Sequence, residues 1–138
     1  AHVQYPCALS ASGGDIVVVY GWVYLPGTTD ASGWGTGIEA AVGVGPEGSY
    51  PGEDSTWTLS AATYAGDQDG LAPGDLANDE YLGMVTAPTA PGTYHYAYRF
   101  STDGGFSWTY ADLGGDTCAL LGTTDGYDPA TAGVLTVN

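Results

Sequence analysis

The chain has 138 residues, a formal net charge of −15 at pH 7 and 43 % hydrophobic residues. That length suits one domain with a single core, and the apolar content is too high for a disordered chain. The chain has 16 acidic residues, and Arg99 is its one Lys or Arg. It therefore has no basic patch, and we exclude nucleic acids and anionic membrane surfaces as partners.

Short segments rich in Val, Tyr, Thr and Trp alternate with clusters of Gly, Pro and Asp, and no segment has helical periodicity. The segments predict strands over residues 2–9, 16–25, 36–45, 56–65, 80–86, 93–101, 106–113 and 133–137. Pro6 interrupts the first strand, which is therefore expected at a sheet edge. Gly21, in the middle of the second strand, predicts a bulge or a close approach of another part of the chain.

The number and spacing of these strands indicate the fold class. Seven or eight short strands separated by turns are typical of an all-β, antiparallel, Ig-like β-sandwich. A small closed barrel is the alternative. No repeat or change in composition divides the chain, so residues 1–138 are expected to form a single domain. Long acidic loops are expected at the ends of the sandwich, where functional residues are common.

Two cysteines, Cys7 and Cys118, lie near opposite ends of the chain. An even number of cysteines favours a disulfide in an oxidising compartment, and two buried free thiols are the alternative. The acidity, the absence of Lys and the many Tyr, Trp, Gly and Thr residues resemble exported surface proteins. Ala1 is the kind of residue that signal-peptide cleavage leaves. We therefore expect an extracellular or cell-surface protein whose signal peptide has been removed.

Residues 101–108 read Ser-Thr-Asp-Gly-Gly-Phe-Ser-Trp. Ser101, Asp103, Gly105 and Trp108 match the pattern Ser-x-Asp-x-Gly-x-x-Trp, so the segment resembles the Asp-box of sialidase-type (BNR) propellers. The resemblance implies a β-hairpin turn in which Asp103 accepts hydrogen bonds from turn amides, Gly105 has a positive φ and Trp108 packs beneath the turn. The motif occurs once, in a chain too short for a propeller, and therefore predicts a hairpin and not a sialidase.

The pattern of the whole chain looks like that of Ig-like modules of secreted bacterial proteins. It is carried by the valine-rich segment 16–25, Gly-Pro-Glu-Gly at 45–48, Gly-Thr-Tyr-His-Tyr-Ala-Tyr-Arg-Phe at 92–100 and Gly-Tyr-Asp-Pro at 126–129. Such modules occur beside polysaccharide-degrading enzymes and in surface proteins, so the resemblance implies a non-catalytic role. No nucleophile-elbow pattern accompanies His95, which lies in the middle of a strand, and we expect no enzymatic activity.

One acidic loop is a candidate calcium site. Asp67, Asp69, Asp75, Asp79 and Glu80 could supply oxygen ligands on a flexible, glycine-containing segment. The full EF-hand pattern is absent, and a solvated acidic loop is the alternative. No cofactor is expected to be required, and Ca²⁺ is the one candidate ion.

Aromatic residues with a polar group dominate the chain, which has four Trp and eleven Tyr against two Phe. Such rings suit half-exposed surfaces that bind sugars or proteins. The candidate exposed rings are Trp34, Tyr50, Tyr64, Tyr81 and Tyr127, of which Trp34 is flanked by two glycines in a loop. The alternative is that a sandwich without Lys simply covers its surface with Tyr and Thr.

Two functions remain open, and both are non-catalytic. The first, which we favour from the sequence, is a structural subunit that assembles head-to-tail with copies of itself into a filament or surface layer. The N-terminal strand at residues 1–9 would then be exchanged into a neighbouring subunit. The alternative is a carbohydrate-binding module with Trp34 and nearby Tyr rings as the binding platform.

Overall fold

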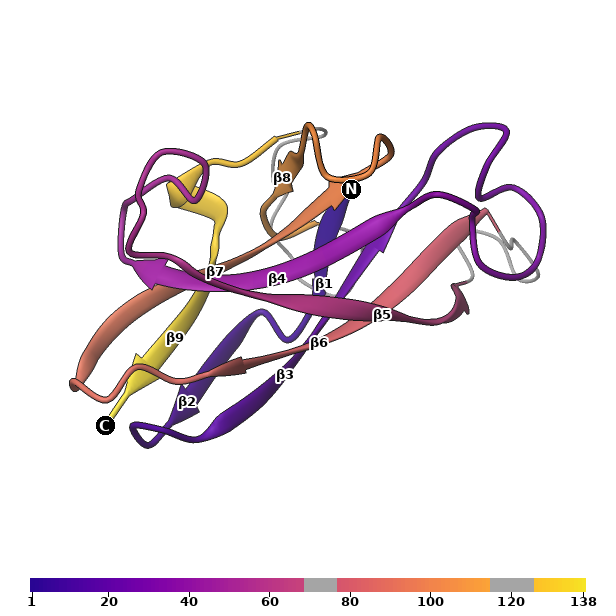
Figure 1. Cartoon of the computed structure of the whole chain (residues 1–138). Helices are drawn as coiled ribbons and strands as arrows, with labels where there is room; N and C mark the ends of the chain where they lie inside the picture. Colours follow the sequence, from indigo (N-terminus) through magenta and orange to yellow (C-terminus); the bar gives the residue numbers. More distant parts are fainter. Residues whose placement is uncertain (69–76, 115–125) are drawn as a thin grey trace.

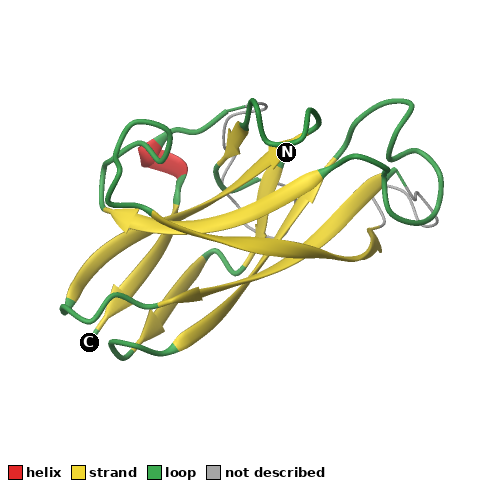
Figure 2. Ribbon diagram, viewed as in Figure 1, coloured by secondary structure: helices red, strands yellow, loops and turns green. Residues whose placement is uncertain are grey.

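The computed structural model describes residues 1–68, 77–114 and 126–138, and these form nine β-strands and one short 3-10 helix (Figures 1 and 2). The strands are β1 (His2–Tyr5), β2 (Ala8–Ala11), β3 (Ile16–Val23), β4 (Glu39–Pro46), β5 (Thr58–Gln68), β6 (Asn78–Thr86), β7 (Gly92–Ser101), β8 (Thr109–Ala111) and β9 (Gly133–Val137), and the helix is η1 (Pro129–Thr131). Within these ranges no helix is long and apolar enough to cross a membrane.

The strands hydrogen-bond in the order β1-β3-β6-β5-β4-β7-β9-β2, and β8 pairs with β7. All pairs of named strands are antiparallel except β2 and β9, which are parallel. The expectation of an all-β, mostly antiparallel chain is therefore confirmed for the described residues. The order places strands that are distant in sequence side by side, as β4 and β7 show (Figure 1).

Strand β5 connects two layers. Its first half, up to Ala62, pairs with β4, and its second half, from Thr63, pairs with β6. The register shifts between Tyr64 and Gly66, and such an irregularity bends a strand and increases its twist. Strands β1, β3 and β6 therefore form one layer, and β4, β7, β9 and β2 form the other.

The core lies between these layers, and Tyr98 of β7 connects them. Its hydroxyl donates to the carbonyl oxygen of Val19 on β3 at 2.6 Å. Its ring lies against Gly21, where an added Cβ would be 2.6 Å from the ring. The close approach that Gly21 suggested in the sequence is thus explained by an aromatic side chain from the opposite layer.

The first predicted strand is two short strands in the structure. The peptide bond between Tyr5 and Pro6 is cis, and on either side of it β1 pairs with β3 while β2 pairs with β9. The N-terminal segment is thus paired within its own chain and occupies both ends of the strand order. Cys7, between the two strands, packs against the core, whereas Cys118 lies outside the described residues, so the disulfide stays a prediction.

Candidate functional site

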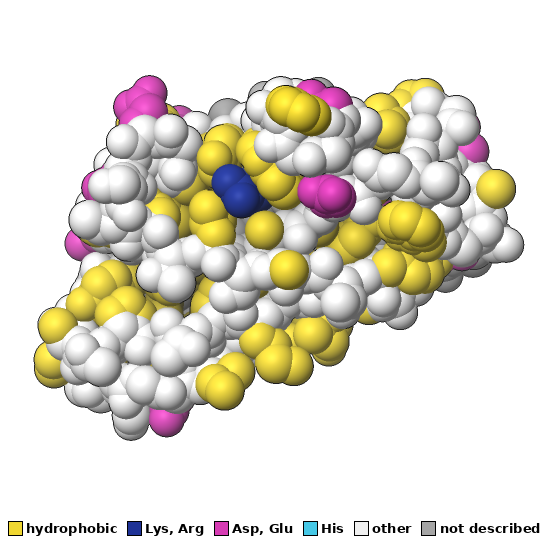
Figure 3. Space-filling view, in the orientation of Figure 1, with side chains coloured by type: hydrophobic (Ala, Val, Ile, Leu, Met, Phe, Trp, Pro, Cys, Tyr) yellow, Lys and Arg dark blue, Asp and Glu magenta, His cyan; other side chains and the backbone are white. Residues whose placement is uncertain are grey.

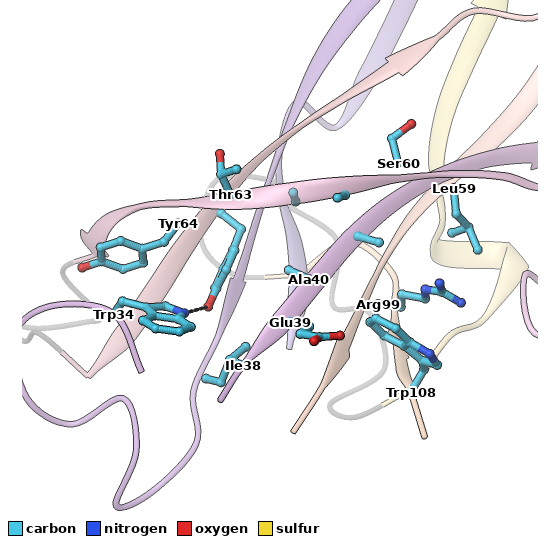
Figure 4. Close-up of a pocket in the computed structure, with 14 residues that line it drawn as sticks. Trp34, Ile38, Glu39, Ala40, Leu59, Ser60, Thr63, Tyr64, Arg99 and Trp108 are labelled. Atoms are coloured by element: carbon cyan, nitrogen blue, oxygen red, sulfur yellow. Dashed lines mark hydrogen bonds between the residues drawn. The ribbon is translucent and has the colours of Figure 1, made fainter. Parts of the chain in front are cut away.

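A groove of about 460 Å³ lies where β4, β5 and β7 meet the loop that joins β3 to β4 (Figure 4). Alanines of β4 and β5 supply much of its lining, and Glu39 and Arg99 are its two charged residues. In Figure 4, Glu39 lies between Trp34 on one side and Arg99 with Trp108 on the other. The groove therefore combines an apolar floor with a few polar groups and aromatic rings, which is the usual composition of a ligand site.

Hydrogen bonds on both sides of Trp34 fix this residue at one end of the groove. The amide of Gly33 donates to both carboxylate oxygens of Asp67, at 3.1 and 2.9 Å. The amide of Gly35 donates to Oδ2 of Asp79 at 2.6 Å. The indole Nε1 of Trp34 donates to the hydroxyl of Tyr81 at 3.1 Å. Although it is held at these points, the Trp34 side chain is 53 % exposed, so its ring is rigid and accessible.

The phenol groups of Tyr64 and Tyr81, at the Trp34 end of the groove, remain protonated over the neutral pH range. Burial raises the pKa of Tyr81 to about 12, and burial together with the hydrogen bond to Asp67 raises the pKa of Tyr64 to about 12. Tyr64 donates to Oδ1 of Asp67 at 2.8 Å. Asp79 is fully buried, and burial raises its pKa. These hydrogen-bonded groups form a polar support for the Trp34 loop.

The other end of the groove is formed by a stacked pair. The guanidinium carbon of Arg99 lies 3.8 Å from the centre of the Trp108 ring, in the geometry of a cation–π interaction. The Nε atom of Arg99 is buried and has no hydrogen-bond partner in the described part of the chain. Figure 3 shows the one Lys or Arg side chain of the protein among hydrophobic side chains, with an acidic side chain nearby.

The hairpin at residues 101–108 adjoins this end of the groove. Asp103 accepts hydrogen bonds from the amide of Ser107 at 2.9 Å, from its hydroxyl, and from the hydroxyl of Ser101 at 2.8 Å. These bonds lower the pKa of Asp103 to about 2. Gly105 has a φ of 88°, and its amide donates to Ser101 Oγ at 2.9 Å. The turn is therefore rigid and keeps Asp103 ionised above strongly acidic pH.

The aromatic residues that the sequence singled out divide into two places. Trp34, Tyr64 and Tyr81 come together at the groove. Tyr50 and Tyr127 lie elsewhere, with their ring centres 5.9 Å apart, in a cluster that also includes Trp57. The Tyr81 side chain is only 2 % exposed, because it lies on the inward face of β6. The expectation that the Tyr81 ring is exposed was therefore wrong.

Three of the five candidate calcium ligands lie in the described part of the chain. Asp67 and Asp79 are directly opposite each other on β5 and β6. Glu80 follows Asp79 on β6, and because side chains alternate along a strand it belongs to the other face. Asp69 and Asp75 lie outside the described residues. Within the described ranges no group of three or more His, Cys, Asp or Glu side chains could hold a metal ion, and calcium binding stays a prediction.

Sequence reasoning did not assign Glu39, Arg99 or Phe106 to a site. Arg99 was recognised as the one Lys or Arg of the chain, and its place on a strand rich in tyrosine was the signal that could have assigned it to a site. Phe106 could have been noticed because it follows Gly105 at the tip of the predicted hairpin. Glu39 carried no signal, since it is one of 16 acidic residues. Comparison with known proteins adds nothing to these assignments: no family model matches the chain, and no curated protein matches it.

Proposed function

We propose that the chain is a non-catalytic carbohydrate-binding module that holds a neutral glycan in the groove between Trp34 and Trp108. The observation that carries this proposal is the Trp34 ring, which is 53 % exposed at the groove although hydrogen bonds fix the residue. A rigid, exposed aromatic face offers an apolar surface to the C–H groups of a sugar ring and loses little conformational entropy on binding.

The polar groups of the groove suit hydroxyl groups. A sugar hydroxyl both donates and accepts hydrogen bonds, whereas a carboxylate only accepts and a guanidinium only donates. Glu39 and Arg99 both line the groove, so neighbouring hydroxyls of one sugar could donate to Glu39 and accept from Arg99. The small alanine side chains of β4 and β5 leave room for the sugar ring between these groups and Trp34.

The charge of the chain favours a neutral ligand over an acidic one. The formal net charge is −15, and a polyanionic glycan would be repelled by the protein as a whole. Arg99 could pair with one carboxylate, but Glu39 lies in the same groove and would oppose it. We therefore propose neutral polysaccharides or oligosaccharides as the ligand class.

An Ig-like β-sandwich at the cell surface is part of the same proposal. The two layers, the N-terminal segment that divides between them and the parallel pairing of β2 with β9 support an Ig-like arrangement. A disulfide between Cys7 and Cys118 would suit an extracellular location.

Replacing Trp34 with alanine is expected to weaken glycan binding at least about tenfold, because the stacking face is lost. A glycan array with neutral and acidic glycans would identify the ligands, and isothermal titration calorimetry on the best neutral oligosaccharide would measure the affinity. Because the ring is half exposed, the variant should remain folded, as circular dichroism can check.

Tyr50→Ala is the matched control for Trp34→Ala. Tyr50 is a comparably exposed aromatic residue, at 48 %, but it lies outside the groove, so its removal should leave the affinity unchanged. Equal affinities of the wild type and Trp34→Ala, or the absence of any bound glycan on the array, would contradict the proposal.

A filament subunit is the second candidate function, and the position of the N-terminal segment favours it. The first eleven residues supply the outermost strand at both ends of the strand order, β1 next to β3 and β2 next to β9. Transfer of this segment to a neighbouring chain would link subunits without closing a ring, as head-to-tail assembly requires. The two chain ends also lie far apart (Figure 1).

Electron microscopy and light scattering of the purified chain test this second function. If it holds, regular filaments are expected, and their dependence on millimolar Ca²⁺ would show whether the acidic residues take part in assembly. A strictly monomeric chain, both with and without Ca²⁺, would contradict the filament function and leave the carbohydrate-binding function unaffected.

A further inference from the structure

The tip of the hairpin at residues 101–108 presents an aromatic side chain to solvent. Phe106 is 94 % exposed, whereas the other Phe of the chain, Phe100, is buried in the core. A fully exposed Phe forgoes the roughly 2 kcal/mol that burial of such a side chain contributes. A single exposed apolar residue is common on protein surfaces, so the position of Phe106 decides whether it carries a function.

Phe106 lies beside the groove, because the preceding residue of the turn, Gly105, is close to two residues that line it. A Cβ added to Gly105 would be 3.4 Å from Oε2 of Glu39 and 3.5 Å from Cζ2 of Trp108. Both of these residues line the groove. The hairpin tip therefore borders the end of the groove that lies opposite Trp34, and Phe106 directly follows the residue at that border.

The hairpin also has the rigidity that a binding surface requires. Asp103 accepts hydrogen bonds from the amide and the hydroxyl of Ser107, and Ser101 Oγ accepts one from the amide of Gly105. These bonds fix the backbone immediately before and after Phe106. A side chain presented by a fixed turn loses less entropy on binding than one on a mobile loop.

We propose that Phe106 is a second aromatic contact for the ligand and that the ligand is an extended glycan chain. This inference rests on the proposed carbohydrate-binding function. A short sugar would occupy the groove between Trp34 and the Glu39–Arg99 pair and would not reach Phe106 at the hairpin tip. A longer chain would leave the groove past Glu39 and the Arg99–Trp108 pair and then stack on the ring of Phe106.

The affinity for glycans of different lengths tests this inference. Neutral α- and β-linked glucan oligosaccharides, from disaccharide to hexasaccharide, would be titrated against the wild type, Phe106→Ala and Trp34→Ala. We expect Phe106→Ala to weaken hexasaccharide binding about tenfold and to leave disaccharide binding unchanged. Trp34→Ala should weaken binding at every length. Thr102→Ala, another exposed position on the hairpin, is the control and should change neither.

Two results would overturn the inference while leaving the proposed function intact. They are unchanged hexasaccharide affinity in Phe106→Ala, and a loss that is equal at every length, which would indicate an indirect effect on the groove. Failure of the proposed function would give different results. Either Trp34→Ala would bind oligosaccharides of every length as tightly as the wild type does, or the wild type would bind none of them. Because Phe106 is exposed, its replacement should not change the unfolding free energy, which urea titration can verify.

Discussion

Replacing Gly21 with alanine is expected to lower the free energy of unfolding by about 3 kcal/mol, at the upper end of the usual cost of overpacking a core. An added Cβ would be 2.6 to 2.7 Å from three ring carbons of Tyr98. Tyr98 is fully buried, and its hydroxyl donates to Val19, so the ring has no free space into which it can move. The two layers must therefore separate locally. Urea unfolding monitored by fluorescence would measure the change.

Gly52→Ala is the matched control for Gly21→Ala. A Cβ at Gly52 would be 3.2 Å from Cε2 of Tyr110, and Tyr110 is only half-buried, so its ring can shift. Replacing Gly52 with alanine should therefore change the unfolding free energy by less than about 0.5 kcal/mol. In a Tyr98→Leu background, Gly21→Ala should cost much less, because the smaller side chain removes the overlap. An equal cost in both backgrounds would contradict the assigned contact.

The positions of the strands were predictable because their signals are local. Alternation of apolar and polar residues and clusters of Gly, Pro and Asp placed a strand near each of β3 to β9. The pairing of the strands could not be predicted in the same way, since it depends on residues far apart in sequence. No local pattern marked the change of partner within β5. Pro6 marked a break in the first strand, but the sequence did not indicate that its two halves would pair with β3 and β9.

The candidate site was predictable only in part for the same reason. Trp34 was identified because glycines flank it in a loop, and the structure places its exposed ring at the groove. Tyr81 could not be assigned to the inward face from sequence, because its neighbours on β6 include the outward-facing apolar residues Leu82 and Met84. Glu39 and Arg99 approach the groove from two paired strands, and no spacing in the sequence reveals that proximity.

Deletion of residues 1–11 is expected to lower the free energy of unfolding by more than about 3 kcal/mol. The deletion removes the fully buried Val3 from the core. It also removes the carbonyl of Pro6 that accepts from the Tyr96 hydroxyl, and the carbonyl of Ala11 that accepts from the amide of Asn138. It leaves the edges of β3 and β9 open, and open edges favour pairing with another chain. Urea unfolding of the truncated and full-length chains would measure the loss.

A synthetic peptide of residues 1–11 should restore stability to the truncated chain. The truncated chain still carries β3 and β9, which are the strands that this segment normally pairs with. A peptide carrying Val3→Asp should fail, since a carboxylate would enter the core at the position of Val3 without a partner. If the truncated chain is as stable as the full chain, or if both peptides restore it equally, the segment is not the stabilising element that its pairing indicates. A segment that binds specifically in trans can also pass from one subunit to the next. Complementation by the wild-type peptide would therefore establish the physical step on which filament assembly by strand exchange depends.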